Sequence, residues 1–318
     1  MQATSHQILI VRLSSMGDVI HTLPAAASLK RSFPDSRVTW IVRPRWMPLL
    51  AGNPYLDEVI PLERSVPASL KLAGQLRARR IDLCIDFQGL LQTALLGFAA
   101  RPQTLAGFAG DRVRERPAAW FYSKPLPTQA EHAVERNLEL AAGAGATHRV
   151  HAFPLPQGVP EGRLPAGEFV LASPLAGWSA KQWPAENWSE LAKTLDLPLV
   201  VNGPPAAESA LRQIAGAQVH LSSISGLIDA TRRATAVIGV DSGPMHLAAA
   251  LAKPGVALFG PTDPARHGPY GGSLQVLRDA QAQTSYHRDT NIAASMRAIT
   301  PEMVRTALHH VLRQSKPA

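Results

Sequence analysis

The sequence predicts an α/β protein that contains two doubly wound parallel sheets. Short apolar segments alternate with segments of helical hydrophobic spacing along the whole chain, a pattern typical of parallel strands joined by covering helices. The alternation occurs in two runs, which a stretch without periodicity separates. The chain length of 318 residues also exceeds one typical domain, so we expect two domains of about 150 residues each.

The first run of alternation covers residues 7–145. We expect strands at 7–13, 37–42 and 81–87, and helices at 18–33, 68–80, 89–100 and 133–145. The stretch 151–168 then reads HAFPLPQGVPEGRLPAGE, in which proline and glycine recur without periodicity. Such a composition is typical of a linker.

The second run of alternation begins after this linker. We expect strands at 169–173, 198–203, 234–240 and 255–260, and helices at 184–195, 207–216, 245–252 and 300–314. The predicted domains are therefore an N-terminal domain at 1–155, a C-terminal domain at 156–300 and a terminal helix at 301–318. We expect this helix to pack back toward the N-terminal domain.

Composition predicts a soluble intracellular protein. Hydrophobic residues make up 46% of the chain and charged residues 18%, which is ordinary for a chain that buries a core. The single cysteine, Cys84, allows neither an internal disulfide nor a cysteine metal cluster, as is usual in a reducing cytosol. The N-terminus, MQATSHQ, is polar, and no apolar run reaches the roughly 18 residues of a spanning helix.

The positive charge predicts an anionic partner. The formal net charge is +8, the pI is near 10.0, and basic residues gather in 71–80 and 110–120. Such a surface attracts nucleic acid, acidic lipid headgroups or phosphorylated substrates. We expect no nucleic acid, because no helix-turn-helix, zinc-finger or RNP-like signature is present. A solvated basic face without a partner remains an alternative.

Residues 236–264, AVIGVDSGPMHLAAALAKPGVALFGPTDP, predict a strand, a tight turn, a short helix and a second strand. Asp241 ends the first strand, and Ser242 and Gly243 form the turn before His246. Backbone N–H groups at a helix N-terminus attract anions, and a glycine lets a ligand approach the backbone. The segment therefore suits a diphosphate. The alternative is that Asp241 and Ser242 only cap the helix while His246 packs.

A second polar turn, RLSSMGDVIHTLPA at 12–25, lies where the first predicted strand ends and the first predicted helix begins. Asp18 is either a cap that stabilises the first helical turn by roughly 1 kcal/mol or part of an active-site wall. His21, one turn further on, is expected to be a packing residue.

The sequence resembles the bacterial lipopolysaccharide heptosyltransferases, family 9 of the glycosyltransferases. The resemblance runs in order through nearly the whole chain and rests on segments 8–30, 81–96, 131–140, 181–191 and 236–264. It is strongest to the heptosyltransferase I type, which adds the first heptose to Kdo-lipid A. The resemblance implies a GT-B fold, in which two Rossmann-like domains face a central cleft and the C-terminal one holds ADP-heptose. It also implies an inverting transfer without a metal or cofactor.

The resemblance also implies roles for particular residues. Asp18 matches the family's catalytic base, with Ser14, Ser15 and Gly17 shaping its loop toward the acceptor. Lys181, in SAKQWP, matches the lysine that binds the donor phosphates, although a plain surface lysine remains an alternative. The remaining donor-binding candidates are Asp241, Ser242, Gly243, His246, Glu208 and Thr262.

Three of these expectations remain open. Glu208 would bind the ribose hydroxyls. Thr262 and Asp263 form either the edge of the phosphate site or a simple turn. The stretch before Lys181, SPLAGWSA at 173–180, departs from the threonines and acidic residues usual in heptosyltransferase I, so Ser179 or backbone amides would take their place.

The acceptor side is expected in the basic N-terminal domain. Candidate contacts are Gln88, Arg112, His132 and Arg136, each of which could equally be an ordinary surface or core polar residue. A basic domain suits an acidic membrane face. We therefore expect a cytoplasmic monomer that associates peripherally with the inner membrane, where Kdo-lipid A is embedded.

Two other classes of function remain alternatives. One is another GT-B sugar-nucleotide enzyme, such as a hexose transferase or a hydrolysing epimerase. The other is a nucleotide-sugar or lipid-binding module, which would not require a base such as Asp18. A NAD-dependent dehydrogenase is disfavoured, because no G-x-G-x-x-G follows a strand.

Overall fold

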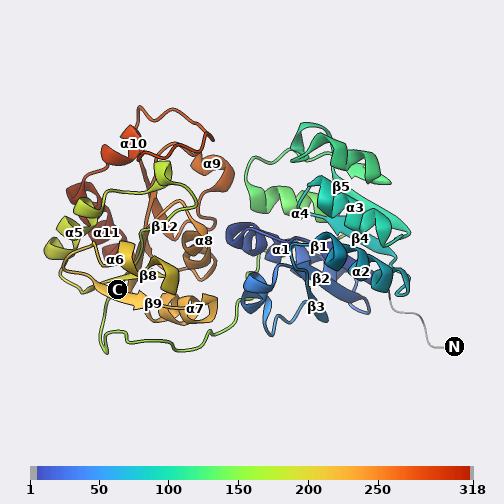
Figure 1. Cartoon of the computed structure of the whole chain (residues 1–318), viewed down its shortest axis with the longest axis horizontal. Coiled ribbons are helices and arrows are strands. Elements are labelled where there is room, and N and C mark those ends of the chain that lie inside the picture. The colour runs from blue at the N-terminus through green and yellow to red at the C-terminus, as the bar shows by residue number, and fades with distance from the viewer. Residues whose placement is uncertain (1–5, 316–318) are drawn as a thin grey trace. The chain divides into compact units, whose positions relative to one another are not determined.

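The computed structural model describes residues 6–315. Residues 1–5, which begin the polar N-terminus, and residues 316–318, which end the predicted terminal helix, lie outside the described part. The chain divides into two compact units, unit 1 at Met1–Pro156 and unit 2 at Gln157–Ala318, and Figure 1 shows the elements of each.

Unit 1 contains one six-stranded parallel sheet. Its strand order is β3-β2-β1-β4-β5-β6, the order of the Rossmann fold. The strands are β1 (Gln7–Val11), β2 (Arg37–Val42), β3 (Glu58–Pro61), β4 (Leu83–Asp86), β5 (Thr104–Phe108) and β6 (Lys124–Leu126). β1 and β4 are almost entirely buried, as expected of central strands covered on both faces.

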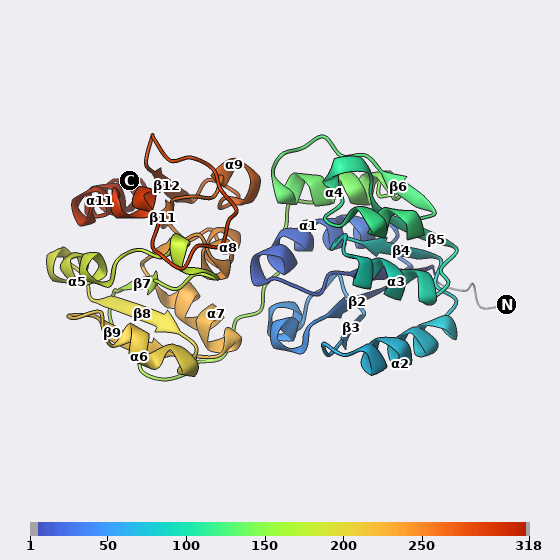
Figure 2. The ribbon, with the colours of Figure 1, turned by 45° about the horizontal axis from the view of Figure 1, so that its top comes forward.

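Helices cover both faces of this sheet. They are α1 (Met16–Ser32), α2 (Val66–Arg77), α3 (Leu91–Ala99), α4 (Ala133–Gly143) and the 3₁₀ helices η1 (Pro44–Leu50), η2 (Gly110–Arg112) and η3 (Arg116–Phe121). α1 packs against α4, and α2 against α3, as can be followed in Figure 2. Right-handed crossovers that run in opposite directions from β1 put the two helix pairs on opposite faces.

Unit 2 repeats this topology. Its parallel strands are ordered β12-β11-β10-β7-β8-β9, which is the same order counted from β7. The strands are β7 (Val170–Ser173), β8 (Leu199–Gly203), β9 (Gln218–Leu221), β10 (Ala236–Val240), β11 (Gly255–Phe259) and β12 (Leu274–Arg278). The helices are α5 (Ala185–Thr194), α6 (Glu208–Leu211), α7 (Ile224–Arg233), α8 (Gly243–Ala250), α9 (Pro264–His267), α10 (Ala294–Arg297), α11 (Pro301–Ser315), η4 (Ser179–Lys181) and η5 (Pro205–Ala207).

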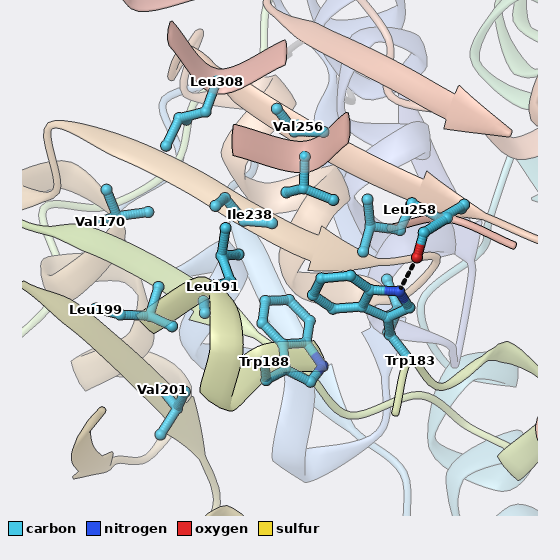
Figure 3. Packing of buried hydrophobic residues seen from close by; sticks show 14 of the residues in the cluster. Val170, Trp183, Trp188, Leu191, Leu199, Val201, Ile238, Val256, Leu258 and Leu308 are labelled. Carbon is cyan, nitrogen blue, oxygen red and sulfur yellow. Dashed lines mark hydrogen bonds between the residues drawn. The ribbon is translucent and has the colours of Figure 1, made fainter. Parts of the chain in front are cut away.

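Two tryptophans join the C-terminal helices to the core of unit 2 (Figure 3). The rings of Trp183 and Trp188 pack edge to face, with centroids 4.9 Å apart. Trp183 Nε1 donates a 2.8 Å hydrogen bond to the carbonyl of Ile299, just before α11. Truncating a buried side chain of this size to alanine costs about 3–5 kcal/mol, so this contact is a main attachment of the C-terminal segment.

The structure corrects the predicted elements in two places. α11 packs against α5, β11 and β12, so residues 301–315 belong to unit 2 instead of forming a separate element. Its packing toward the N-terminal domain stays a prediction. The predicted helix 207–216 is only α6, because helical bonding ends at Leu211. The sequence also did not reveal five strands of the sheets: β3, β5, β6, β9 and β12.

The predicted linker holds no helix or strand between 151 and 168, and the division between the units falls inside it. Its first half is tied to unit 1, where Asn53 donates to the carbonyl of Pro154. Its second half is tied to unit 2 by Glu161, which accepts hydrogen bonds from the backbone and side chain of Ser223. These hydrogen bonds lower the pKa of Glu161.

Candidate active site

Each sheet has one point at which the strand order reverses direction. In unit 1 this switch point lies between β1 and β4, and in unit 2 between β7 and β10. Doubly wound sheets bind ligands at the carboxyl ends of the strands that flank such a point. The segments that leave these strand ends are therefore the place to look for a site, and both carry an ion pair.

The switch point of unit 1 holds Asp18, in the first turn of α1. Its Oδ1 accepts a 2.6 Å hydrogen bond from Arg12 Nη2, and we call Arg12 and Asp18 the Asp18 pair. Its Oδ2 accepts from the backbone N–H and the hydroxyl of Ser15, at 2.8 and 2.9 Å. The bond from the Ser15 N–H is a helix cap, so the structure confirms the capping role of Asp18, and its role as a base stays a prediction. The Asp18 side chain is 20% exposed, which leaves it accessible to a ligand hydroxyl.

Arg12 fixes this carboxylate to the sheet. The guanidinium also donates to the carbonyl of Phe87, directly after β4, and its side chain is only 9% exposed. A buried guanidinium that bridges a carboxylate and a carbonyl has little freedom to move. The Asp18 pair thereby ties α1 to the ends of both central strands.

A buried carboxylate under the loop after β4 holds that loop in place. Asp86 accepts hydrogen bonds from the N–H groups of Gln88 and Gly89, and from the hydroxyls of Thr93 and Tyr122. Burial raises the pKa of Asp86, while these four hydrogen bonds act in the opposite direction. Burial and the nearby charge of Asp86 also raise the pKa of Tyr122.

Gln88 was expected to contact the acceptor, and the structure gives its side-chain oxygen a structural partner instead. The residue is buried, and Oε1 accepts from the N–H groups of Leu13 and Ser14, at 3.0 and 3.2 Å. Gln88 therefore positions the loop before Asp18. A contact between its amide nitrogen and an acceptor stays a prediction.

Two further acceptor candidates lie beside α1. His132 caps α4 by accepting a hydrogen bond from the N–H of Val134 through Nδ1. Its ring lies 5.4 Å from that of His21, edge to face, and His21 is buried, which confirms His21 as a packing residue. Arg136 lies in the first turn of α4. Arg112 lies in η2, and its side chain is partly exposed.

The switch point of unit 2 holds Lys181 and Asp241, which we call the Lys181 pair. Lys181 Nζ lies 2.6 Å from Asp241 Oδ2. The hydroxyl of Thr262 donates to the same carboxylate oxygen at 2.7 Å. Thr262 therefore lies beside the Lys181 pair, and its place at the edge of a phosphate site stays a prediction, whereas Asp263 caps α9 by accepting from the N–H of Ala265. The plain-surface alternative for Lys181 is contradicted, because its side chain is 12% exposed and paired.

Aromatic and basic groups surround Lys181. Its Nζ lies 4.5 Å from the centroid of the Trp178 ring. The guanidinium carbon of Arg288 lies 5.4 Å from the same ring. The segment that carries Arg288 is fixed here by a hydrogen bond from Ala293 N–H to the carbonyl of Ala180. Two cations that share one ring make this strand end strongly attractive to anions.

The N-terminus of α8 begins directly after Asp241. Ser242 occupies the cap position of α8, as the capping alternative expected, but its side chain makes no cap hydrogen bond. Gly243 is the first helical residue and His246 is buried. Glu208, the first residue of α6, accepts a 2.6 Å hydrogen bond from Arg212, which follows the helix. Its role at a ribose stays a prediction.

Sequence reasoning missed the residues that contact the candidate site residues or position the loops around them. Arg12 and Asp86 had a signal, because each is a charge at the end of an apolar strand and such charges are rarely buried without a partner. Trp178 and Arg288 had none, since their proximity depends on the fold.

Two properties of the described residues bear on ligands and membranes. Between residues 6 and 315, no three His, Cys, Asp or Glu side chains are grouped so that they could hold a metal ion. In the same range, no helix combines the length and the apolar character needed to cross a membrane.

The two doubly wound units, each with an ion pair at its switch point, define a protein of the GT-B class. The family described as "Glycosyltransferase family 9 (heptosyltransferase)" matches residues 69–295. The chain belongs to this family and is a glycosyltransferase, as the resemblance predicted.

Curated relatives agree with this assignment. The chain is 33% identical over 297 residues to lipopolysaccharide heptosyltransferase 1 of Pseudomonas aeruginosa, with 84% of this chain and 82% of that protein covered. It is 30% identical over 298 residues to lipopolysaccharide heptosyltransferase 1 of Escherichia coli K12, with 86% and 93% covered. These relatives confirm the predicted likeness to heptosyltransferase I.

Solved structures agree on the fold. E. coli heptosyltransferase WaaC with ADP matches with a TM-score of 0.77 and 27% identity, over 96% of this chain and 99% of that one. A family 9 glycosyltransferase from Veillonella parvula has a TM-score of 0.82 at 21% identity, with 99% of both chains covered. The latter supports the GT-B fold alone.

Proposed function

We propose that this protein transfers heptose from ADP-heptose to the Kdo sugar of Kdo-lipid A, with inversion at the anomeric carbon and without a metal ion. The observation that carries the proposal is the presence of an ion pair at each switch point: a partly exposed carboxylate in unit 1 and a lysine beside a helix N-terminus in unit 2. The names of the relatives support the acceptor class. A neighbour at 27% identity, described as E. coli heptosyltransferase WaaC with ADP-2-deoxy-2-fluoro heptose, supports the donor.

Asp18 acts as the general base in this proposal. The acceptor hydroxyl attacks the anomeric carbon from the side opposite the departing diphosphate, so the new C–O bond forms as the bond to phosphate breaks. The hydroxyl proton passes to the Asp18 carboxylate. Arg12 and Ser15 hold both carboxylate oxygens, which restricts the carboxylate to one orientation toward the acceptor. Ser14 and Ser15 lie just before α1, whereas Gly17, expected in the loop, lies in the first turn of α1 next to Asp18.

Lys181 stabilises the negative charge that develops on the leaving ADP. Its ammonium and the N–H groups at the start of α8, at Ser242 and Gly243, act where metal-dependent transferases use a cation. Asp241 and Thr262 orient the lysine. His246 assists from α8, and Glu208 binds the ribose.

The acceptor binds unit 1 and the donor binds unit 2. Arg112, His132 and Arg136 contact the anionic groups of the acceptor, and Gln88 supports the loop that faces it. The protein acts as a cytoplasmic monomer on the inner face of the inner membrane.

ADP release tests this function. The purified protein is given ADP-heptose with and without Kdo-lipid A, and ADP-mannose in parallel. We expect release that requires both ADP-heptose and the acceptor, that persists in a chelator, and that is lost in Asp18→Asn. Asp35→Asn is the matched control, because Asp35 is an exposed carboxylate of the same unit. Equal release from ADP-mannose would contradict the proposed donor, and inhibition by the chelator would contradict the metal-free mechanism.

A further inference from the structure

The surface of unit 1 exposes large apolar side chains along one side of α3. Leu91, Leu95 and Phe98 are 36%, 43% and 58% exposed. Their spacing of four and three residues puts them on one side of the helix. Trp120 in η3 is 82% exposed. η3 packs against α3, where the rings of Phe98 and Phe121 meet edge to face with centroids 5.5 Å apart. We call Leu91, Leu95, Phe98 and Trp120 the apolar face.

The opposite side of α3 already supplies the contact with the core. Ala94, Leu96 and Gly97 are buried, and a Cβ added at Gly97 would come within 2.8 Å of Leu105. The helix therefore sits tightly on the sheet, and the exposed side chains of the apolar face are not part of this contact. A contiguous exposed apolar patch of this kind marks an interaction site.

α2, which is a neighbour of α3, also exposes apolar side chains. Val66 and Leu70, one turn apart, are 72% and 68% exposed. α2 packs against α3, and Arg77 of α2 donates a 2.6 Å hydrogen bond to the carbonyl of Ala99 at the end of α3. The two helices are therefore neighbours, and each carries exposed apolar side chains.

Basic residues accompany these apolar ones. Residues 64–124, which contain α2, α3 and η3, hold ten Lys and Arg against four Asp and Glu. One of the four acids, Asp86, is fully buried. Arg114 and Arg116, whose side chains are exposed, lie six and four residues before Trp120. Most of the chain's net charge of +8 therefore belongs to this segment.

We propose that the apolar face, with Arg114 and Arg116 beside it, docks this protein on a bilayer that contains anionic lipid. Tryptophan is enriched where membrane meets water. Apolar side chains that enter the headgroup region, next to arginines that attract anionic headgroups, are the usual composition of a surface-binding site. The excess of positive charge over so short a segment is what favours a lipid surface over a second copy of this equally basic chain.

The place of this surface in the fold agrees with the proposed function. Leu91 follows the loop after β4, and its N–H donates to Glu115. That loop carries Gln88, which holds the segment before Asp18. A bilayer against the apolar face would thus hold a lipid-anchored acceptor at the strand ends that carry the candidate base. Only this last step depends on the proposed function.

Vesicle sedimentation tests the docking surface. Wild-type protein is mixed with vesicles of phosphatidylcholine alone or of phosphatidylcholine with phosphatidylglycerol, and we expect binding to the second kind. Phe98→Ser and Trp120→Ser should each weaken binding by about tenfold, and Arg114→Gln or Arg116→Gln by about fivefold each. Met303→Ser, at an exposed apolar position of α11, is the matched control and should bind like the wild type.

Three measurements can contradict the docking surface or separate it from the proposed enzymatic function. Equal binding of Trp120→Ser and wild type would overturn the docking surface, as would equal binding to neutral vesicles. Sedimentation velocity without vesicles checks the other occupant: a dimer that Trp120→Ser abolishes, with no vesicle binding, would make this face a contact between copies. ADP release measured with a deacylated acceptor should be unchanged in Phe98→Ser and Trp120→Ser. If the wild-type protein released no ADP with this acceptor, that result would contradict the proposed enzymatic function and leave the docking surface untouched.

Discussion

The two switch points carry the same kind of ion pair with the exposures reversed. In unit 1 the acid is the more exposed member, because the side chains of Asp18 and Arg12 are 20% and 9% exposed. In unit 2 the cation is the more exposed member, at 12% for Lys181 against 8% for Asp241. The more exposed member of each pair is also the one with the proposed chemical role.

The less exposed member of each pair has a second bond to the protein. Arg12 donates to the carbonyl of Phe87 after β4, and Asp241 accepts from Thr262 after β11. These bonds fix the less exposed partner, which in turn orients the more exposed one. In the proposed function, one arrangement therefore serves a base in unit 1 and an anion-binding cation in unit 2, depending on which charge is the more exposed.

The largest expected effect comes from Asp18→Asn. The asparagine keeps the shape of the side chain but cannot take the acceptor proton, so turnover should fall by at least about 100-fold. Steady-state ADP release with ADP-heptose and Kdo-lipid A measures it. An unchanged turnover number would remove Asp18 from the mechanism and make it a helix cap.

The second largest loss of activity is expected from Lys181→Ala. It removes a charge-assisted contact to the donor phosphates, so kcat/KM for ADP-heptose should fall roughly 10- to 100-fold. Lys253→Ala, at a lysine of the same unit that donates to the carbonyl of Ala234, is the control and should leave kcat/KM unchanged. Equal losses in both variants would mean that general positive charge, not Lys181, is responsible.

Substituting the two less exposed partners sharpens the comparison. Arg12→Lys keeps the charge but loses the fork that bridges Asp18 and Phe87, and kcat should fall about tenfold at an unchanged KM for ADP-heptose. Asp241→Asn loosens Lys181, and KM for ADP-heptose should rise about fivefold. Steady-state kinetics of the two variants measure this. The opposite split between kcat and KM would reverse the roles of the two pairs.

The smallest expected effect is on the pH dependence of stability, and it comes from substituting the buried Asp86 at the end of β4. Burial raises its pKa in the folded protein above the unfolded value of about 3.9, so the folded state binds the proton more tightly. Its contribution to the free energy of unfolding is complete below that unfolded value and is lost as pH rises through the raised pKa. Asp86→Asn has no such proton, so the stability difference between wild type and variant should fall as pH rises.

Urea denaturation at a series of pH values from about 4 upward measures this difference. Asp35→Asn, at an exposed carboxylate of the same unit, is the control and should show no comparable trend. A difference between wild type and Asp86→Asn that grows with pH would contradict the raised pKa.

Sequence predicted seven interior strands of the two sheets and missed all four edge strands, β3, β6, β9 and β12, together with the interior strand β5. β1, β2, β4, β7, β8, β10 and β11 are apolar runs, because central strands are covered on both faces. β6 (Lys124–Leu126) has only three residues with two of them exposed, and β3 is only partly buried. Strands like these carry neither the length nor the hydrophobic pattern that would reveal them.

The candidate site divides in the same way. Asp18, Lys181 and Asp241 lie in segments long enough to resemble a known family, so their types and positions were predictable. Thr262 was also a candidate, but its contact with Asp241 was not predicted, and neither were the contacts of Trp178 with Lys181 and Arg288. Thr262 is 21 residues from Asp241 and Arg288 is 110 from Trp178 in the sequence, and only the fold brings each pair together.

Equilibrium binding of ADP-heptose without acceptor tests most directly whether the two pairs have opposite roles. Isothermal titration would compare wild type, Asp18→Asn and Lys181→Ala. We predict that Asp18→Asn binds within about twofold of wild type, whereas Lys181→Ala binds at least about tenfold more weakly. Weaker binding by Asp18→Asn together with unchanged binding by Lys181→Ala would contradict the assignment of base to unit 1 and donor phosphates to unit 2.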